Sequence, residues 1–212
     1  MSNPITTNLR VIAAICGNFY QESTVNPGIW ENLTVGGPGY GLGQWTDNAQ
    51  VTRRTALFNW LTANGYSQDS GDGQLAFLIH ENVWLPVGAA GPSRFSSLSA
   101  FLSSTSTDLE MLTGEFMHSW EGIDDGTLPV RLQFAETVLD RFQNDSGERW
   151  SWYTSNSYNS TVFAHRNSMR ILDFFLGNSP QPGPGPTDDE ILAVLAYARK
   201  KKMKVGGIIL EP

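Results

Sequence analysis

The sequence predicts a mainly α-helical domain with a small β excursion near its N-terminal end. Through most of residues 8–143, apolar side chains recur at the spacing of a helical face, and no segment there alternates with the two-residue period of a strand. Residues 23–46 differ, since they hold six glycines and two prolines and have no helical period. With 212 residues, 40% of them hydrophobic, the chain can build one sizeable core and an appendage.

The first helix is expected at residues 8–22, where Thr7 can cap the N-terminus and Val11, Ile15 and Glu22 fall on one face. The glycine-rich stretch after it is expected to form a loop or a short irregular sheet. Further helices are expected at residues 48–64, 72–85, 96–104, 107–120, 130–143 and 165–176.

Local signals support several of these boundaries. Gly65 is a good residue to end the second helix, and Thr107 with Glu110 three residues later forms a capping pattern. Residues 150–163 (WSWYTSNSYNSTVF) are aromatic and β-branched, which favours strand.

The composition changes after residue 177, so we expect the folded domain to cover residues 1–177. Residues 178–189 (NSPQPGPGPTDD) are typical of a proline- and glycine-rich linker. Residues 190–212 contain one short helical segment with a basic end and are too short to form a domain. This tail is expected to be an attachment segment, or the front of a further module.

The charge and the apolar content exclude two classes of partner. The net charge is −7, whereas nucleic-acid binders carry a basic footprint. No apolar run approaches the ~18–20 residues that span a membrane, and no signal peptide is visible at the N-terminus, which predicts synthesis in a cytoplasm. The single cysteine, Cys16, allows no intrachain disulfide and lies in an apolar stretch, so a buried thiol is expected.

No metal or other cofactor is predicted. His80-Glu81 resembles the start of a zinc-binding HExxH motif, but the second histidine is missing because residues 82–84 are Asn-Val-Trp. The remaining histidines, His118 and His165, are scattered, and His118 is expected to be a packed or edge residue of a helix.

Glu22 stands out because it ends an otherwise apolar helix, in the sequence GNFYQEST. The helix dipole places partial negative charge at this end, and Val11 and Ile15 share the same face. Both effects disfavour the carboxylate and are expected to raise the pKa of Glu22. A carboxylic acid that keeps its proton near neutral pH is what glycoside cleavage requires of its general acid. The alternative is a glutamate that simply ends a helix in solvent.

The loop GPGYGLGQWT (37–46) supports the first interpretation. Its glycines allow the backbone to approach a ligand closely. Gln44 offers an amide that can donate and accept hydrogen bonds, and Tyr40 and Trp45 offer flat surfaces of the kind that stack on sugar rings. Trp120 and Glu121, just before the loop GIDDG, are candidates for the far wall of a cleft, the alternative for Trp120 being a place in the core.

The order of these residues resembles the signature of the lysozyme superfamily, which includes goose-type lysozymes and lytic transglycosylases: Glu-Ser, then Asn-Pro, then Gly-Tyr-Gly-Leu-x-Gln. The longer pattern is more similar to the phage tail lysozyme family, and this resemblance covers roughly residues 8–145. It rests on GNFYQEST, NPG, GYGLGQWT, an RxxxLxxWL helix that begins at Arg53, QLAFLIHE (74–81) and FMHSWEGIDDGTLPVRLQFA (116–135).

The resemblance implies an α+β lysozyme-like fold, with Glu22 as the catalytic acid and Tyr40, Gln44 and Trp45 in the substrate cleft. It also implies a muramidase that cleaves the β-1,4 bond between N-acetylmuramic acid and N-acetylglucosamine in bacterial peptidoglycan. Such a protein would belong to the virion, at a phage tail tip, and the C-terminal tail would contact other tail proteins. A wall-binding or structural tail module without catalysis, a lytic transglycosylase and an endolysin acting at lysis are the alternatives.

The second catalytic group is left open by the sequence. Animal-type lysozymes place a carboxylate immediately before the Tyr-Gly of the loop, a position that is Gly39 here. An inverting hydrolase needs a base about 6.5–9.5 Å from the acid. Asp47, just past the loop, is the first candidate, and Glu31, nine residues after Glu22, is the second. Alternatively, the N-acetyl group or the 6-hydroxyl of the substrate attacks, the latter in a transglycosylase.

Overall fold

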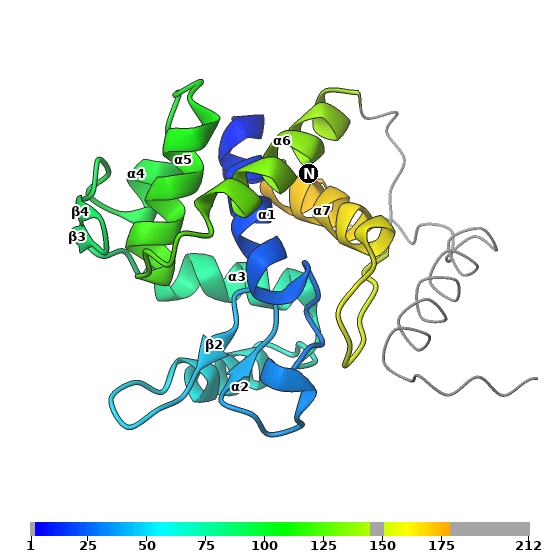
Figure 1. The fold of residues 1–212 in the computed structure, drawn as a ribbon. Coiled ribbons are helices and arrows are strands. Elements are labelled where there is room, and N and C mark those ends of the chain that lie inside the picture. The colour runs from blue at the N-terminus through cyan, green and yellow to red at the C-terminus, as the bar shows by residue number, and fades with distance from the viewer. Residues whose placement is uncertain (1–2, 145–150, 179–212) are drawn as a thin grey trace, which may run out of the picture.

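Helix α1 is the centre of the fold, and other helices pack around it. The computed structural model describes residues 3–144 and 151–178. In Figure 1, α1 runs between α5, α6 and α7, and the small hairpin β1–β2 lies beyond its C-terminal end. The described residues thus form the mainly α fold that the sequence predicts.

The secondary structure in chain order is α1 (Leu9–Ser23), η1 (Glu31–Leu33), β1 (Gly39–Tyr40), β2 (Trp45–Thr46), α2 (Arg53–Ala63), α3 (Gly71–Glu81), β3 (Val87–Gly88), β4 (Gly91–Pro92), α4 (Leu98–Leu102), α5 (Leu109–Phe116), the π-helical turn η2 (Met117–Glu121), α6 (Leu128–Gln143) and α7 (Thr161–Phe175). The strands form two antiparallel pairs, β1 with β2 and β3 with β4. The second of these hairpins has no counterpart in the sequence prediction.

Helix α1 is apolar on all sides because it is covered on all sides. Every residue from Val11 to Phe19 is buried, and α5, α6 and α7 all contact this helix. The sequence predicts Thr7 as the N-cap, but the N-cap found in the structure is Asn8. The Asn8 side chain accepts a hydrogen bond from the Arg10 backbone N–H at 3.0 Å and also donates to two carbonyls that follow α4.

Helices α1 and α6 approach each other closely at Gly17. A β-carbon at this position would collide with the Arg131 carbonyl oxygen and lie 3.0 Å from the Ala135 β-carbon. The glycine is therefore required by the distance between two helix backbones and not by its own backbone angles. The same approach brings the Arg131 side chain beneath the last turn of α1.

The glycine-rich stretch folds over the C-terminal end of α1 as a loop with the short β1–β2 pair, as predicted. Gln74, a buried residue of α3, fixes this loop at two points. Its Oε1 accepts a hydrogen bond from the Leu42 N–H at 2.9 Å, and its Nε2 donates to the Pro27 carbonyl at 2.7 Å. One amide thus satisfies backbone groups on both sides of the loop.

Several predicted helix boundaries differ from those found, and at α2 the cause is a side chain that competes with the helix for backbone hydrogen bonds. Helix α2 starts at Arg53 and not at residue 48, because the Asn48 side chain accepts from the N–H groups of Gln50 and Val51 and forms a turn. The predicted helix at 107–120 is divided into α5 and the π-helical turn η2.

The strand expected within residues 150–163 is absent from its described part. Residues 151–160 are irregular, and α7 starts at Thr161, four residues before the predicted start at 165. The proposed linker, from residue 179 on, and the tail at 190–212 lie outside the described residues. Within residues 3–144 and 151–178, no helix is long and apolar enough to cross a membrane.

We predict that Gly17→Ala destabilises the protein by about 1–3 kcal/mol, the usual cost of overpacking a core contact. The added methyl group must push α6 away from α1, because it meets backbone atoms that cannot move alone. Chemical denaturation monitored by circular dichroism measures this change.

Gly114→Ala in α5 is the matched control, because a β-carbon there meets its nearest neighbour at 3.7 Å, an ordinary contact. This variant is expected to be neutral or up to about 1 kcal/mol more stable, since alanine favours helix over glycine. Equal destabilisation by both substitutions would contradict the close approach at Gly17.

Candidate active site

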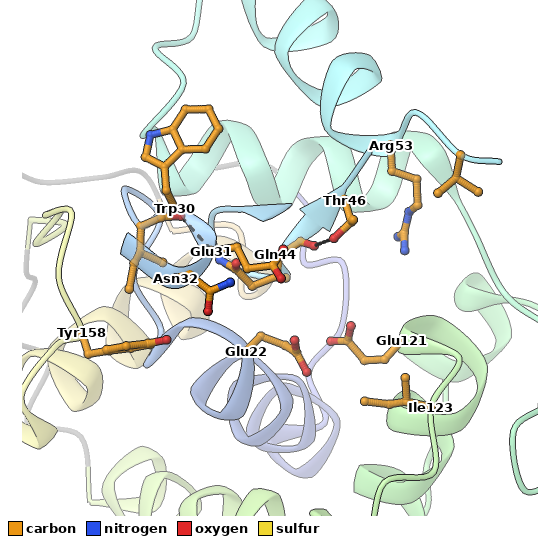
Figure 2. A pocket seen from close by; sticks show the side chains of 13 residues that line it. Glu22, Trp30, Glu31, Asn32, Gln44, Thr46, Arg53, Glu121, Ile123 and Tyr158 are labelled. Carbon is orange, nitrogen blue, oxygen red and sulfur yellow. Dashed lines mark hydrogen bonds between the residues drawn. The ribbon is translucent and has the colours of Figure 1, made fainter. Parts of the chain in front are cut away.

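A cavity of about 370 Å³ opens between the end of α1, the glycine-rich loop and the turn η2 (Figure 2). This volume lies in the range of ligand sites in proteins. Three glutamates line it, together with one arginine, two aromatic side chains and several polar groups. The lining residues are Glu22, Ile29, Trp30, Glu31, Asn32, Gly43, Gln44, Thr46, Val51, Arg53, Glu121, Ile123 and Tyr158.

Glu22 occupies the last turn of α1 and faces this cavity, as Figure 2 shows. The next residue, Ser23, fixes the helix end, since its buried hydroxyl donates to the carbonyls of Phe19 and Leu42 at 2.9 and 2.8 Å. The side chain of Glu22 is 20% exposed, so it reaches the cavity while most of it is enclosed. Glu22 therefore lies at a helix end and lines a cavity, as the sequence predicts.

Arg131 of α6 is the partner of Glu22. Its Nη2 lies 2.7 Å from Glu22 Oε1, and its side chain is 1% exposed. Asn18 Oδ1 and Thr127 Oγ1 accept hydrogen bonds from the same guanidinium at 3.0 and 2.9 Å, so the arginine is held from three directions.

The pKa of Glu22 is raised above its ordinary value. Burial is the main cause, the charge and hydrogen bond of Arg131 oppose it, and the charges of Asp125 and Glu31 add to it. The increase expected from the sequence is thus present, although the arginine that moderates it was not foreseen.

Glu121 lies across the cavity from Glu22, and Figure 2 shows the two carboxyl groups pointing toward each other. The Oε1 atom of Glu121 is buried and has no hydrogen-bond partner among the described residues. Burial and the nearby charge of Glu22 raise the pKa of Glu121 well above its ordinary value, against the attraction of Arg131 and Arg53. Glu121 therefore holds a proton more firmly than an exposed glutamate does.

Glu31 fills the space that a side chain at position 39 would need. A β-carbon built on Gly39 would lie 2.8 Å from Glu31 Oε2, 3.0 Å from Gln44 Oε1 and 3.2 Å from Thr46 Oγ1. The carboxylate that is missing from position 39 is thus replaced in space by one from the 3-10 turn η1.

Asp47, the first candidate for the second catalytic group, is not among the residues that line the cavity. Its carboxylate accepts hydrogen bonds from the Thr55 N–H and hydroxyl at 3.1 and 2.6 Å and pairs with Arg54 at 3.1 Å. Although partial burial alone would raise the pKa of Asp47, these bonds lower it. Asp47, which precedes α2, therefore holds the first turn of that helix.

Of the predicted substrate-binding residues, only Gln44 lines the cavity. Trp45 and Trp120 are fully enclosed in an aromatic cluster, with ring centroids 5.6 Å apart. Tyr40 is 4% exposed and packs on Trp30 at 4.7 Å. These three rings are core side chains because the loop and η2 turn them toward α1 and α2, so they present no face to this cavity. The core alternative for Trp120 is the one found.

The remaining candidates have structural partners. His80 stacks on Trp60 with centroids 5.4 Å apart, and His118 Nε2 lies 3.7 Å from Asp124. Cys16 is buried as predicted, and burial raises the pKa of its thiol to about 12. Within the part of the chain that the structure describes, no group of three or more histidine, cysteine or acidic residues is arranged to hold a metal ion.

A helical domain whose central helix ends in a glutamate beside a glycine-rich hairpin has the lysozyme-like arrangement. The sequence profile of the phage tail lysozyme family matches residues 7–142, so the chain belongs to that family. A curated relative, Morphogenesis protein 1 of Bacillus phage B103, is 42% identical to it. That alignment covers 84% of this chain but 49% of the relative, so the chain spans about half of that protein's length.

Arg131, the partner of Glu22, and Tyr158, which lines the cavity, were not expected from the sequence. Arg131 has no signal beyond its place in a predicted helix, and Tyr158 lies in a segment that the sequence assigns to strand. A buried acid favours a cationic partner, which points to an arginine on a later helix. The sequence does not indicate which arginine this is.

We predict that Glu121→Gln raises the thermal midpoint at pH 8 and leaves it nearly unchanged at pH 4. A group whose pKa is raised by folding stabilises the folded state below its unfolded pKa, and this contribution is lost as the pH rises through the folded value. The glutamine side chain does not ionise, so the variant does not lose this stability as the pH rises. Thermal unfolding from pH 4 to pH 8 measures the difference between variant and wild type.

The matched control is Glu136→Gln, because Glu136 is exposed and lies in the interior of α6, away from the ends of the helix. Its midpoint is expected to follow the wild type across the whole pH range. A Glu121→Gln protein that is less stable than the wild type at pH 8 would show that the charged carboxylate is favoured in place.

Proposed function

We propose that this domain is a muramidase, which hydrolyses the β-1,4 bond between N-acetylmuramic acid and N-acetylglucosamine in peptidoglycan. The observation that carries the proposal is Glu22, an acid with a raised pKa that faces a cavity of about 370 Å³. Membership of the phage tail lysozyme family supports the same reaction class.

In the first step, Glu22 transfers its proton to the glycosidic oxygen as the bond from that oxygen to the sugar C1 breaks. Burial raises the pKa of Glu22 and so favours the protonated form before the reaction, and Arg131 stabilises the carboxylate that remains afterwards. The two opposing influences serve a general acid, which must both hold and release a proton near the working pH.

In the second step, a water molecule attacks C1 and Glu31 accepts its proton. Glu31 is preferred to Asp47 because it lines the cavity, whereas Asp47 is engaged by Arg54 and Thr55 outside it. The raised pKa of Glu121 favours its protonated form, which can donate a hydrogen bond to a sugar oxygen from the opposite wall. The product is a hydrolysed sugar with a free reducing end.

The setting is proposed from the relative in Bacillus phage B103, whose name describes a protein of phage morphogenesis. We infer that the present protein is made in the host cytoplasm, is built into the virion at the tail and opens the wall locally for genome ejection. Its C-terminal tail, residues 190–212, is proposed to contact other tail proteins.

We predict that Glu22→Gln lowers the rate of peptidoglycan cleavage at least ~10²-fold, the usual contribution of a general acid. The amide keeps the shape of the side chain and can still accept a hydrogen bond from Arg131, so the fold should persist. Clearing of a suspension of purified cell wall and circular dichroism spectra measure the two properties. Equal clearing by wild type and variant would remove Glu22 from the mechanism, and no clearing by the wild type would favour a wall-binding module.

We predict that Glu31→Gln lowers the rate ~10²-fold or more, whereas Asp47→Asn stays within about twofold of the wild type. The difference follows from their positions, since one carboxylate lines the cavity and the other holds α2. Mass spectrometry of the released muropeptides completes the test. A 1,6-anhydro product, with Glu31→Gln fully active, would instead indicate a transglycosylase in which the 6-hydroxyl of the substrate attacks.

A further inference from the structure

Tyr158, in the segment 151–160 that precedes α7, lines the cavity although this segment lies outside the region matched by the family profile. In Figure 1 this segment, drawn in yellow, extends from α7 to the blue stretch that follows α1. We call residues 151–160 the strap. The strap is a candidate for substrate binding because it borders the cavity. It is not part of the sequence pattern that defines the family.

Two asparagines attach the strap to the chain just after Glu22. Asn26, which is fully buried, donates to the carbonyls of Ser155 and Ser157 at 2.9 and 2.7 Å and accepts from the Ser155 N–H at 3.2 Å. Asn159 makes the second attachment, since its backbone N–H donates to the Thr24 hydroxyl at 2.7 Å. The strap is therefore fixed on both sides of residue 158.

The strap also supports strained backbone next to the acid. Thr24 and Val25 both have positive φ angles, 53° and 54°, which are rare for branched residues. The Val25 carbonyl accepts a hydrogen bond from Asn167 of α7 at 2.7 Å, and the same amide group donates to the strap at the Tyr153 carbonyl. The strap and the chain that follows Glu22 are thus one connected unit.

Tyr158 is the residue of this wall that is free to bind a ligand. It lines the cavity, and Figure 2 shows its hydroxyl directed toward the interior. The residue is 48% exposed, and within the described residues its ring makes no aromatic contact and its hydroxyl no hydrogen bond. Trp30, the other aromatic residue of the cavity, already packs on Tyr40 and Phe58.

We propose that Tyr158 is a glycan-binding residue, whose ring stacks on one sugar of the polysaccharide while the strap holds it in place. A tyrosine on a rigid backbone offers an apolar face and a hydroxyl at little entropic cost, which suits a ring with axial C–H groups and rim hydroxyls. This inference rests on the proposed function, since it names a binding residue for the substrate of that reaction.

The test is the affinity of the 212-residue protein for a peptide-free tetrasaccharide of alternating N-acetylglucosamine and N-acetylmuramic acid. Isothermal titration calorimetry is done in the Glu22→Gln background, so that no cleavage occurs. Adding Tyr158→Ala is expected to weaken binding about tenfold, or 1.4 kcal/mol. Tyr158→Phe, which keeps the ring, is expected to stay within about threefold.

Tyr66→Ala is the matched control, because Tyr66 is 39% exposed and does not line the cavity. Its affinity is expected to equal that of the background protein. The thermal midpoint of Tyr158→Ala is expected to stay close to that of the background, since among the described residues the side chain loses no aromatic contact and no hydrogen bond. Unchanged binding by Tyr158→Ala, equal losses in both alanine variants, or no binding by the background protein would overturn the proposal.

These outcomes are independent of the reaction itself. Tetrasaccharide binding that depends on Tyr158, in a protein whose wild type does not cleave cell wall, would support the binding residue and reject the muramidase. Cleavage that depends on Glu22 but with unchanged affinity in Tyr158→Ala would retain the muramidase and reject Tyr158 as a binding residue.

Discussion

The contact between Arg131 and Glu22 is the constraint on which the rest of this domain depends. A guanidinium that is 1% exposed is costly to bury unless its donors find partners. Here α1 provides two of them, Asn18 and Glu22, and the start of α6 provides Thr127. Such a geometry requires the two helix backbones to lie very close, and Gly17 makes that distance possible. The packing of α1 on α6 and the position of the acid are therefore one structural requirement.

The electrostatics of the cavity follow from this arrangement. Three glutamates share a small space with Arg131 below and Arg53 at the wall. Glu22 is attracted directly by an arginine at 2.7 Å, whereas the buried oxygen of Glu121 has no hydrogen-bond donor among the described residues. Because like charges in one cavity cannot all be stabilised, the proton is held most firmly at Glu121. Two chemically identical side chains thus have different protonation behaviour because only one of them is paired.

The aromatic residues divide into two groups for a similar geometric reason. Trp45 and Trp120 carry the large surfaces that suggest sugar stacking, but they fill the core between α1 and the loop. The cavity instead receives its exposed ring from the strap, which is attached by Asn26 and Asn159 and not by apolar packing. A hydrogen-bonded wall can leave a tyrosine ring half exposed, whereas a core of this density cannot. This side of the cavity is therefore attached to the rest of the protein by polar contacts.

The sequence alone determined the helical class, the loop after α1 and the choice of Glu22, because these depend on local periodicity, glycine content and position in one helix. Helix ends were missed where Asn48 and Asn8 redirect backbone hydrogen bonds, which requires knowing which amide each side chain reaches. Glu121 was a candidate for the far wall of the cleft from the sequence, whereas tertiary structure alone decided that Arg131 and Tyr158 lie near Glu22 and that Asp47 lies outside the cavity. Except for Asp47, these residues are more than 90 positions away from Glu22 along the chain. Whether residues so far apart in sequence meet in space is set by how the helices pack and not by the local pattern.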